Sequence, residues 1–204
     1  EREFDRKAMD TLRRHGAIPL LDWSSRASPG GVDQPRFSLR TIIAGDHDAF
    51  IRRWARAAKA WGHPFFLRFD HEMNGDWYAW SERRNGNRPG EYVRAWRHVH
   101  DIFEQVGVRN ATWVWCPNIV YPGAIPLRRV FPGGHYADWV AVDGYNFGVD
   151  ARLPESRWMP FTRLFAQSYR ALRAIAPRRP IMIAETASAE RGGSKAAWIA
   201  DAFR

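Results

Sequence analysis

The sequence predicts an α/β protein, a (β/α)8 barrel that is incomplete in this chain, and three observations lead to that prediction. Short apolar runs typical of buried strands alternate with stretches whose apolar residues recur at helical spacing. The strand-like runs lack polar alternation, which is typical of parallel strands covered on both faces. Polar or charged residues follow every run, as a barrel requires, because its chemistry is built at the carboxyl ends of its strands.

The expected elements alternate along the whole chain. Strands are expected at residues 17–21, 65–69, 111–115, 138–142 and 180–184. Helices are expected at residues 3–15, 46–61, 90–105, 160–175 and 194–204. A complete barrel has eight strands in about 250 residues, so we expect the first strands and the last to be missing. An open doubly wound sheet is the competing architecture, but its polar residues would gather near one switch point.

Composition sets the broad class of protein. The 204 residues are 45% hydrophobic and 26% charged, and no repeat or linker divides them, so we expect one catalytic domain over residues 1–204. The net charge is +9, but the arginines are spread along helical stretches, and we expect no nucleic-acid partner. No run approaches the roughly 18 apolar residues of a membrane span, so we expect no membrane partner. Cys116 is the single cysteine and has no disulfide partner within the chain.

Tryptophan is unusually frequent, with eleven residues. Its flat apolar face and N–H group suit the apolar faces and hydroxyl rims of sugar rings. The competing interpretation is that most of these side chains belong to the core.

Two glutamates are placed for acid/base chemistry. Glu72 and Glu185 each follow an expected strand, so a barrel would bring them together despite their separation in sequence. Glycoside hydrolysis needs two such carboxyl groups, one to protonate the leaving oxygen and one to attack or to activate water. A metalloprotease motif would need a second histidine four residues after His71, and Gly75 stands there. We therefore expect no metal and no cofactor.

The run at residues 66–80, FLRFDHEMNGDWYAW, resembles the acid/base signature of glycoside hydrolase family 26. The segments WCPN at 115–118, VDGYN at 142–146 and IAET at 183–186 follow in the order of that family's next strand ends. The resemblance covers nearly the whole chain, from about the third barrel strand to the seventh helix. It implies a (β/α)8 barrel whose activity retains anomeric configuration.

The resemblance also implies roles for individual residues. Glu72 would be the proton donor and later the base, and Glu185 the carboxylate that forms the glycosyl-enzyme. Tyr145 would hold Glu185 ionised and oriented, while His71 and Asn118 would line the subsite of the cleaved sugar.

Five further residues are expected at the substrate. Trp77 and Trp80 would be sugar platforms, and Trp23 would lie at the end of its strand beside the substrate. Asp143 would position a hydroxyl or a neighbouring side chain. Arg68 would lie inside the barrel beside the carboxylates and favour their ionised form, or make a structural ion pair.

Two departures from the mannanase pattern leave the polysaccharide open. Mannanases of the family often carry a Trp-Phe-Trp-Trp-like run where this chain has WYAW at 77–80, and Trp-His where it has Trp23-Ser24. We expect a retaining endo-β-glycoside hydrolase, a secreted monomer acting on β-1,4-mannan or mixed-linkage β-1,3/1,4-glucan; β-1,3-xylan stays possible. The alternative from another class is a non-catalytic carbohydrate-binding protein on a degenerate barrel.

Overall fold

The computed structural model describes residues 2–150 and 152–204. Its strands are β1 (Leu20–Trp23), β2 (Phe65–Phe69), β3 (Ala111–Trp115), β4 (Trp139–Asn146) and β5 (Ile181–Ser188). Its helices are α1 (Arg6–Arg14), the 3-10 turn η1 (Pro35–Phe37), α2 (Leu39–Ala44), α3 (Asp48–Trp61), α4 (Glu91–Val106), α5 (Leu127–Val130), α6 (Phe161–Ile175) and α7 (Lys195–Asp201). Within the described ranges, no helix is both long and apolar enough to cross a membrane.

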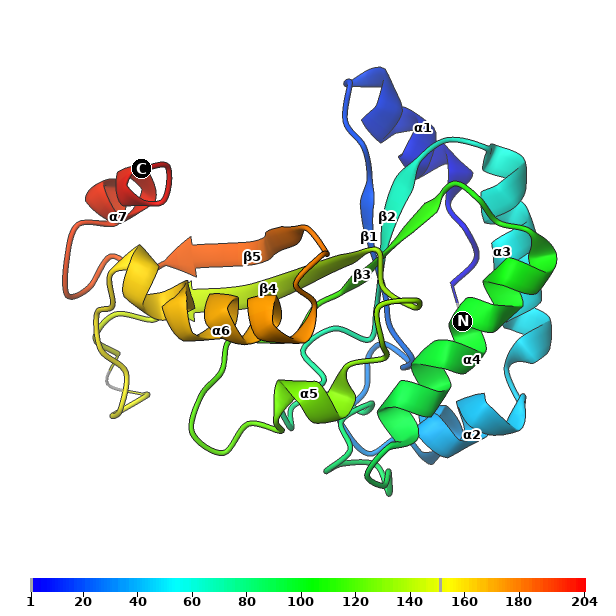
Figure 1. Cartoon of the computed structure of the whole chain (residues 1–204), viewed down its shortest axis with the longest axis horizontal. Helices are drawn as coiled ribbons and strands as arrows, with labels where there is room; N and C mark the ends of the chain where they lie inside the picture. Colours follow the sequence, from blue (N-terminus) through cyan, green and yellow to red (C-terminus); the bar gives the residue numbers. More distant parts are fainter. Residues whose placement is uncertain (1, 151) are drawn as a thin grey trace.

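The strands form a single parallel sheet that curls. Their order in the sheet is the order in the sequence, β1-β2-β3-β4-β5, and every neighbouring pair is parallel. In Figure 1, β1 and β2 run upright whereas β4 and β5 lie across the view. The sheet is therefore a half-barrel, which confirms the predicted partial (β/α)8 architecture.

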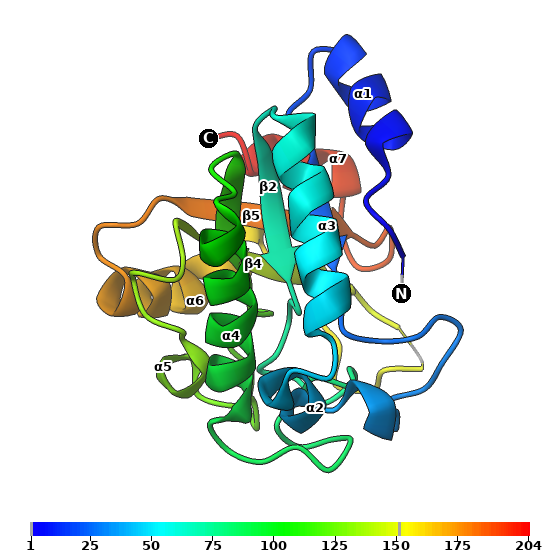
Figure 2. The ribbon, with the colours of Figure 1, turned by 90° about the vertical axis from the view of Figure 1, so that its right-hand side faces the viewer.

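The convex face of the sheet is covered by helices. Figure 2 shows α3 and α4 side by side in front of β2. Alternate residues of β2, namely Phe65, Leu67 and Phe69, are buried and join the main hydrophobic core with the apolar stripes of these helices. A side-chain period of two along β2 sends Phe66 and Arg68 to the other face.

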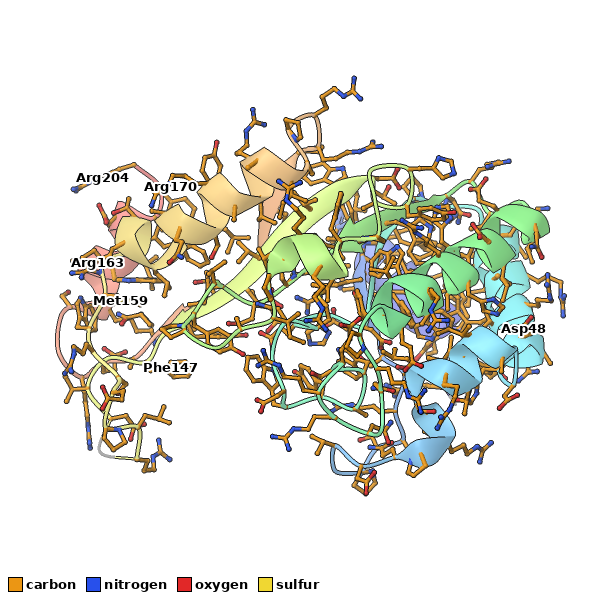
Figure 3. All side chains as sticks on the ribbon, turned by 60° about the horizontal axis from the view of Figure 1, so that its bottom comes forward. Asp48, Phe147, Met159, Arg163, Arg170 and Arg204 are labelled. Atoms are coloured by element: carbon orange, nitrogen blue, oxygen red, sulfur yellow. The ribbon has the colours of Figure 1, made fainter. Side chains whose placement is uncertain are left out.

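The concave face has its own small apolar cluster. Val114, Cys116 and Ala141 are fully buried there, with Phe66 and Met182 packed against them. These apolar side chains fill the concave side of the sheet next to the polar residues of the strand ends. Figure 3 gives the extent of the molecule, with Asp48 of α3 at one end and Arg163 of α6 at the other.

A single extra residue in β5 determines which way Glu185 faces. Val142 pairs with Ile183, but the next residue of β4, Asp143, pairs with Glu185, so Ala184 is unmatched. A β-bulge of this kind turns the following side chain to the other face of the strand. Glu185 therefore points to the same concave face as Asp143, although simple alternation would put it with Ile183.

The strands at residues 65–69 and 111–115 lie where the sequence predicts them. The last two strands are longer than predicted, so Asp143 and Glu185 lie inside strands and not after them. The first strand lies at Leu20–Trp23, shifted towards Trp23. The short helices α2 and α5 have no counterpart in the prediction, because runs of six and four residues carry too little periodicity.

We predict that Gly144→Ala lowers the free energy of unfolding by about 1–3 kcal/mol, the usual cost of overpacking a core. A Cβ at Gly144 would lie 2.6 Å from Cγ2 of Ile119 and 2.8 Å from Cε1 of Phe165. The control is Gly31→Ala, where no atom lies within 4 Å of the added Cβ. Urea unfolding of both variants measures the effect, and equal stability of the two would contradict the packing described here.

Candidate active site

Arg68 lies at the centre of the concave face and contacts three carboxylates. It is 1% exposed. Its Nη1 donates to both carboxylate oxygens of Asp143, at 2.9 and 2.8 Å, and its Nη2 donates to Asp22 at 2.6 Å. Nη2 also forms an ion pair with Glu185. Because an unpaired buried charge is strongly destabilising, these contacts fix the guanidinium and the carboxylates around it.

Glu185 is held as an ionised carboxylate. Its Oε1 accepts from Arg68 and its Oε2 accepts from the hydroxyl of Tyr145. Partial burial raises the pKa of Glu185, but the hydrogen bond from Tyr145 and the charge of Arg68 outweigh burial and leave it below its ordinary value. The predicted contact between Tyr145 and Glu185 and the predicted place of Arg68 beside the carboxylates agree with this geometry.

Glu72 has a different set of partners, all of them neutral. Its side chain accepts from the indole N–H of Trp77 at 2.7 Å and from the amide of Asn118 at 2.6 Å. The residue is 7% exposed, and its φ of 54° lies in the left-handed region. Its backbone N–H donates to the carbonyl oxygen of Cys116 at 2.7 Å, which ties the end of β2 to the end of β3.

Asn74 holds Asn118 in place, a role the sequence did not reveal. Its Oδ1 accepts from the backbone N–H of Asn118 and its Nδ2 donates to the backbone carbonyl of the same residue, both at 2.9 Å. The Asn74 side chain is fully buried. Its position two residues after Glu72 was the available signal, but only the fold shows that it faces the next strand.

His71 is buried beside Tyr78 and is uncharged at neutral pH. Its Nε2 lies 3.3 Å from the hydroxyl of Tyr78. Burial, and then the positive charge of Arg68, lower the pKa of His71 to about 4. A neutral imidazole in this place can donate or accept one hydrogen bond without competing with Arg68 for the carboxylates.

Trp80, Asp143 and Trp23 lie in three different surroundings. Trp80 is fully buried, stacks on Tyr78 at 4.3 Å and donates its indole N–H to the carbonyl of His71, so it supports the site from behind. Asp143 is also fully buried, and both its oxygens accept from Arg68, so it positions a neighbouring side chain, one of the two roles expected of it. Trp23 is half-buried: its ring stacks on Trp54 at 4.9 Å, and the residue also lines the cavity that contains Glu185, so its predicted place beside the substrate stays a prediction.

Trp77 remains available to a ligand. It is 40% exposed, and its indole lies 5.9 Å from the ring of Tyr121. Tyr121 stands in no motif that points to sugar chemistry, and Asp22 was expected only as a polar residue at the end of its strand. In the part of the chain the structure describes, no group of three or more His, Cys, Asp or Glu residues could hold a metal ion.

Two glutamates on facing strand ends of a parallel half-barrel are the arrangement of barrel glycoside hydrolases. The sequence model of glycosyl hydrolase family 26 matches residues 30–187, and the chain belongs to this family. It is 38% identical over 201 residues to Endoglucanase H of Acetivibrio thermocellus, covering 95% of this chain and 21% of that protein. This chain thus spans about a fifth of that relative's length.

Other similarities agree with the family. A mannan endo-1,4-beta-mannosidase A and B of Caldalkalibacillus mannanilyticus is 33% identical over 81 residues, 37% of this chain and 15% of that protein. The fold is similar to the family 26 domain of an endo-beta-mannanase/endo-beta-glucanase from Prevotella bryantii, with a TM-score of 0.68 at 18% identity. That alignment covers 96% of this chain and 66% of the other.

We predict that His71 makes folding stability fall as the pH drops from about 6.5 to about 4. Its folded pKa lies below its ordinary value of 6.5, so in this window the unfolded chain binds a proton that the native chain does not. His71 contributes at most about 3 kcal/mol to this loss of stability, because each unit of pKa shift corresponds to about 1.4 kcal/mol. Urea unfolding of the wild type and of His71→Gln from pH 7 to pH 4 tests it. The wild type should lose more stability than the variant, and parallel losses would contradict the neutral histidine.

Proposed function

We propose that this chain is the catalytic part of a retaining endo-β-glycoside hydrolase that cleaves a β-linked plant-type polysaccharide. The observation that carries the proposal is the difference between the partners of the two glutamates. Glu185 contacts a guanidinium and a tyrosine hydroxyl, whereas Glu72 contacts only an indole and an amide. An ionised carboxylate facing a carboxyl group without a cation is the division of roles that glycoside hydrolysis requires, and the retaining outcome is proposed from the resemblance to the family.

The proposed reaction has two displacements. Glu185 attacks the anomeric carbon while Glu72 gives its proton to the glycosidic oxygen, so the leaving sugar departs as an alcohol and a glycosyl-enzyme remains. Glu72, now a carboxylate, takes a proton from water, and the water oxygen displaces Glu185 from the anomeric carbon. Two inversions restore the starting configuration. Trp77, whose N–H contacts Glu72, would present its exposed face to the leaving sugar.

The substrate proposal is β-1,4-mannan or mixed-linkage β-1,3/1,4-glucan. The names of the similar proteins, an endoglucanase and a mannan endo-1,4-beta-mannosidase, support both choices. A beta-1,3-xylanase of Vibrio is also similar, at 26% identity over 110 residues, so β-1,3-xylan belongs in the test. We further propose a secreted monomer with no nucleic-acid or membrane partner, since a polymeric substrate lies outside the cell.

We predict that reducing sugar is released from one polymer among galactomannan, glucomannan, mixed-linkage β-glucan and β-1,3-xylan. Glu185→Gln should reduce release by at least about 10⁴-fold, the order of loss on removing a catalytic residue of a covalent mechanism, because the covalent route is gone. The control is Glu155→Gln, whose side chain is 97% exposed, and it should leave activity unchanged. Proton NMR of the first product gives the anomer. An inverted product would refute retention, and a folded full-length protein that binds these polymers without cleaving them would indicate a carbohydrate-binding role.

We predict that Glu72→Gln distinguishes the acid/base role of Glu72 from the nucleophile role of Glu185. Its kcat/KM on polysaccharide should fall by at least about 100-fold, the usual contribution of general acid catalysis. With a 2,4-dinitrophenyl glycoside, the leaving group needs no proton, so the glycosyl-enzyme should still form and azide should accelerate its breakdown. An azide product with retained configuration identifies Glu72 as the acid/base. The same rescue in Glu185→Gln in place of Glu72→Gln would reverse the assignment.

A further inference from the structure

Arg26 stands at the edge of the site with its charge unpaired. Its guanidinium carbon lies 5.6 Å from the ring centroid of Tyr78 and 6.0 Å from that of Trp80. The side chain is exposed, and within residues 2–150 and 152–204 no carboxylate forms an ion pair with it. Contact with an aromatic face orients a guanidinium while its N–H groups remain free to donate.

The backbone on both sides of Arg26 is fixed. Ser25 donates its N–H and its hydroxyl to the two carboxylate oxygens of Asp70, at 2.7 and 2.6 Å. Ala27 donates its N–H to the side chain of Gln34 at 2.7 Å. Asp70 is fully buried and lies two residues before Glu72. The loop that carries Arg26 is therefore anchored to the strand that carries the acid/base, and Arg26 is organised before any ligand binds.

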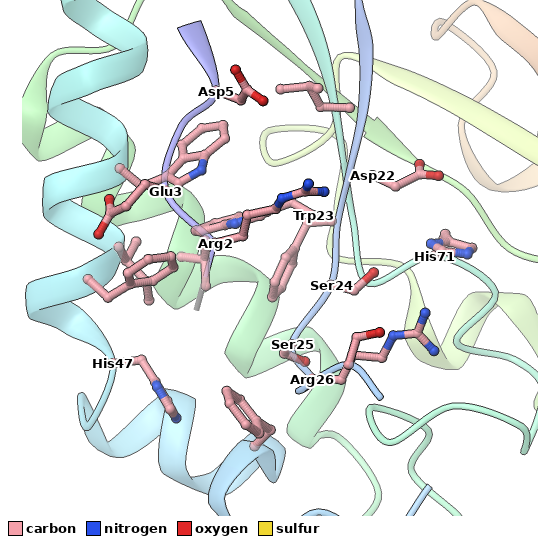
Figure 4. A pocket seen from close by; sticks show the side chains of 18 of the residues that line it. Arg2, Glu3, Asp5, Asp22, Trp23, Ser24, Ser25, Arg26, His47 and His71 are labelled. Carbon is pink, nitrogen blue, oxygen red and sulfur yellow. The ribbon is translucent and has the colours of Figure 1, made fainter. Parts of the chain in front are cut away.

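Arg26 shares a cavity with the nucleophile and not with the acid. The cavity has a volume of about 680 Å³ and is lined by Arg26, Asp22, His71, Tyr78 and Glu185 among others. Figure 4 shows the guanidinium of Arg26 extending below His71, on the side of β1 where Asp22 also points. Glu72, Trp77 and Asn118 are not among the described residues that line this cavity.

This separation assigns a side of the substrate to Arg26. Glu72 protonates the oxygen of the leaving sugar, so Trp77 and Asn118 lie at or beyond the scissile bond on the leaving side. Arg26 shares its cavity with Glu185 and not with Glu72. We therefore place it on the opposite side of the scissile bond, the glycone side, which holds the sugar that Glu185 attacks and the sugars before it. The charges of Arg68 and Arg26 both lower the pKa of His71, and the effect of Arg68 is the larger, so Arg26 lies on the outer side of the site. A sugar held beside His71 and Glu185 would therefore leave Arg26 to the neighbouring sugar.

We propose that Arg26 forms the subsite for the second glycone sugar, the one before the cleaved unit, and donates to two adjacent hydroxyls of a neutral hexose. The inference rests on the proposed glycosidase function and adds a substrate-binding residue to it. A planar guanidinium presents parallel N–H groups that match two oxygens side by side. Asp22 and Glu185 line the same cavity, so their negative charge would disfavour an acidic sugar and favours a neutral one.

The test compares substrates that do and do not reach this subsite. The full-length wild type and Arg26→Ala are assayed on the 2,4-dinitrophenyl β-glycosides of mannose and glucose, which fill only the cleaved-sugar subsite. The same proteins are assayed on the corresponding glycosides of mannobiose and cellobiose, which also fill the next one. Arg170→Ala, an exposed arginine on α6, is the matched control.

We expect Arg26→Ala to lower kcat/KM on a disaccharide glycoside about tenfold or more, the effect of losing charged hydrogen bonds, and to leave the monosaccharide glycoside unchanged. Arg170→Ala should match the wild type on both. Equal losses on the two glycosides would mean that Arg26 only supports the fold of the site, and no loss on either would mean that it touches no sugar; both outcomes overturn the subsite.

Measuring the binding of mannobiose and cellobiose tests the Arg26 subsite independently of the proposed hydrolase activity. If the folded wild type cleaves none of the glycosides, the hydrolase proposal fails, and calorimetric titration with both disaccharides still decides the subsite. Weaker binding by Arg26→Ala than by Arg170→Ala supports it. Equal affinity of the two variants, or no binding by the wild type, overturns it.

Discussion

The ion pairs of Arg68 are the interaction on which the rest of the site depends. One buried guanidinium from β2 contacts carboxylates from β1, β4 and β5, so the charge cluster joins four of the strands. Arginine remains protonated at any physiological pH, and removing one partner of a buried pair leaves an uncompensated charge. The same contacts therefore connect facing strands of the curled sheet and keep Glu185 ionised.

The environments of the two glutamates differ although both stand on the concave face. Glu185 shares Arg68 with Asp22 and Asp143, which places three negative groups around one positive group. Glu72 receives hydrogen bonds from uncharged donors, and one of these donors, Asn118, is held through its backbone by Asn74. The chemical difference between two identical side chains thus arises from the strands that face them.

Irregular backbone aims both glutamates into the site. Asp70 and Glu72 adopt φ values of 44° and 54°, a conformation that costs free energy for any residue with a side chain. Hydrogen bonds to Ser25 and to Cys116 hold these two residues in it. On the other side of the cleft, the unmatched Ala184 turns Glu185 inward. Regular strands would direct at least one of these carboxylates elsewhere.

Much of the fold follows from local pattern. The strands at 65–69 and 111–115 are apolar and continuous, and the helices at 48–61 and 91–106 carry clear apolar stripes that end at glycine. Patterns of this kind are local properties of a chain. The resemblance at residues 66–80 also identifies the family correctly. The two glutamates stand on the concave face, as the barrel prediction requires.

The sequence alone determined the parallel α/β architecture and the family, because each depends on residues close together in the chain, and it predicted the two glutamates as the catalytic pair. Only the tertiary structure decided that Trp80 and Asp143 are buried supports and that Trp23 stacks on Trp54. These outcomes depend on the face to which a side chain points and on what packs over it. One bulged residue or one facing strand changes both, and neither leaves a signal in local sequence.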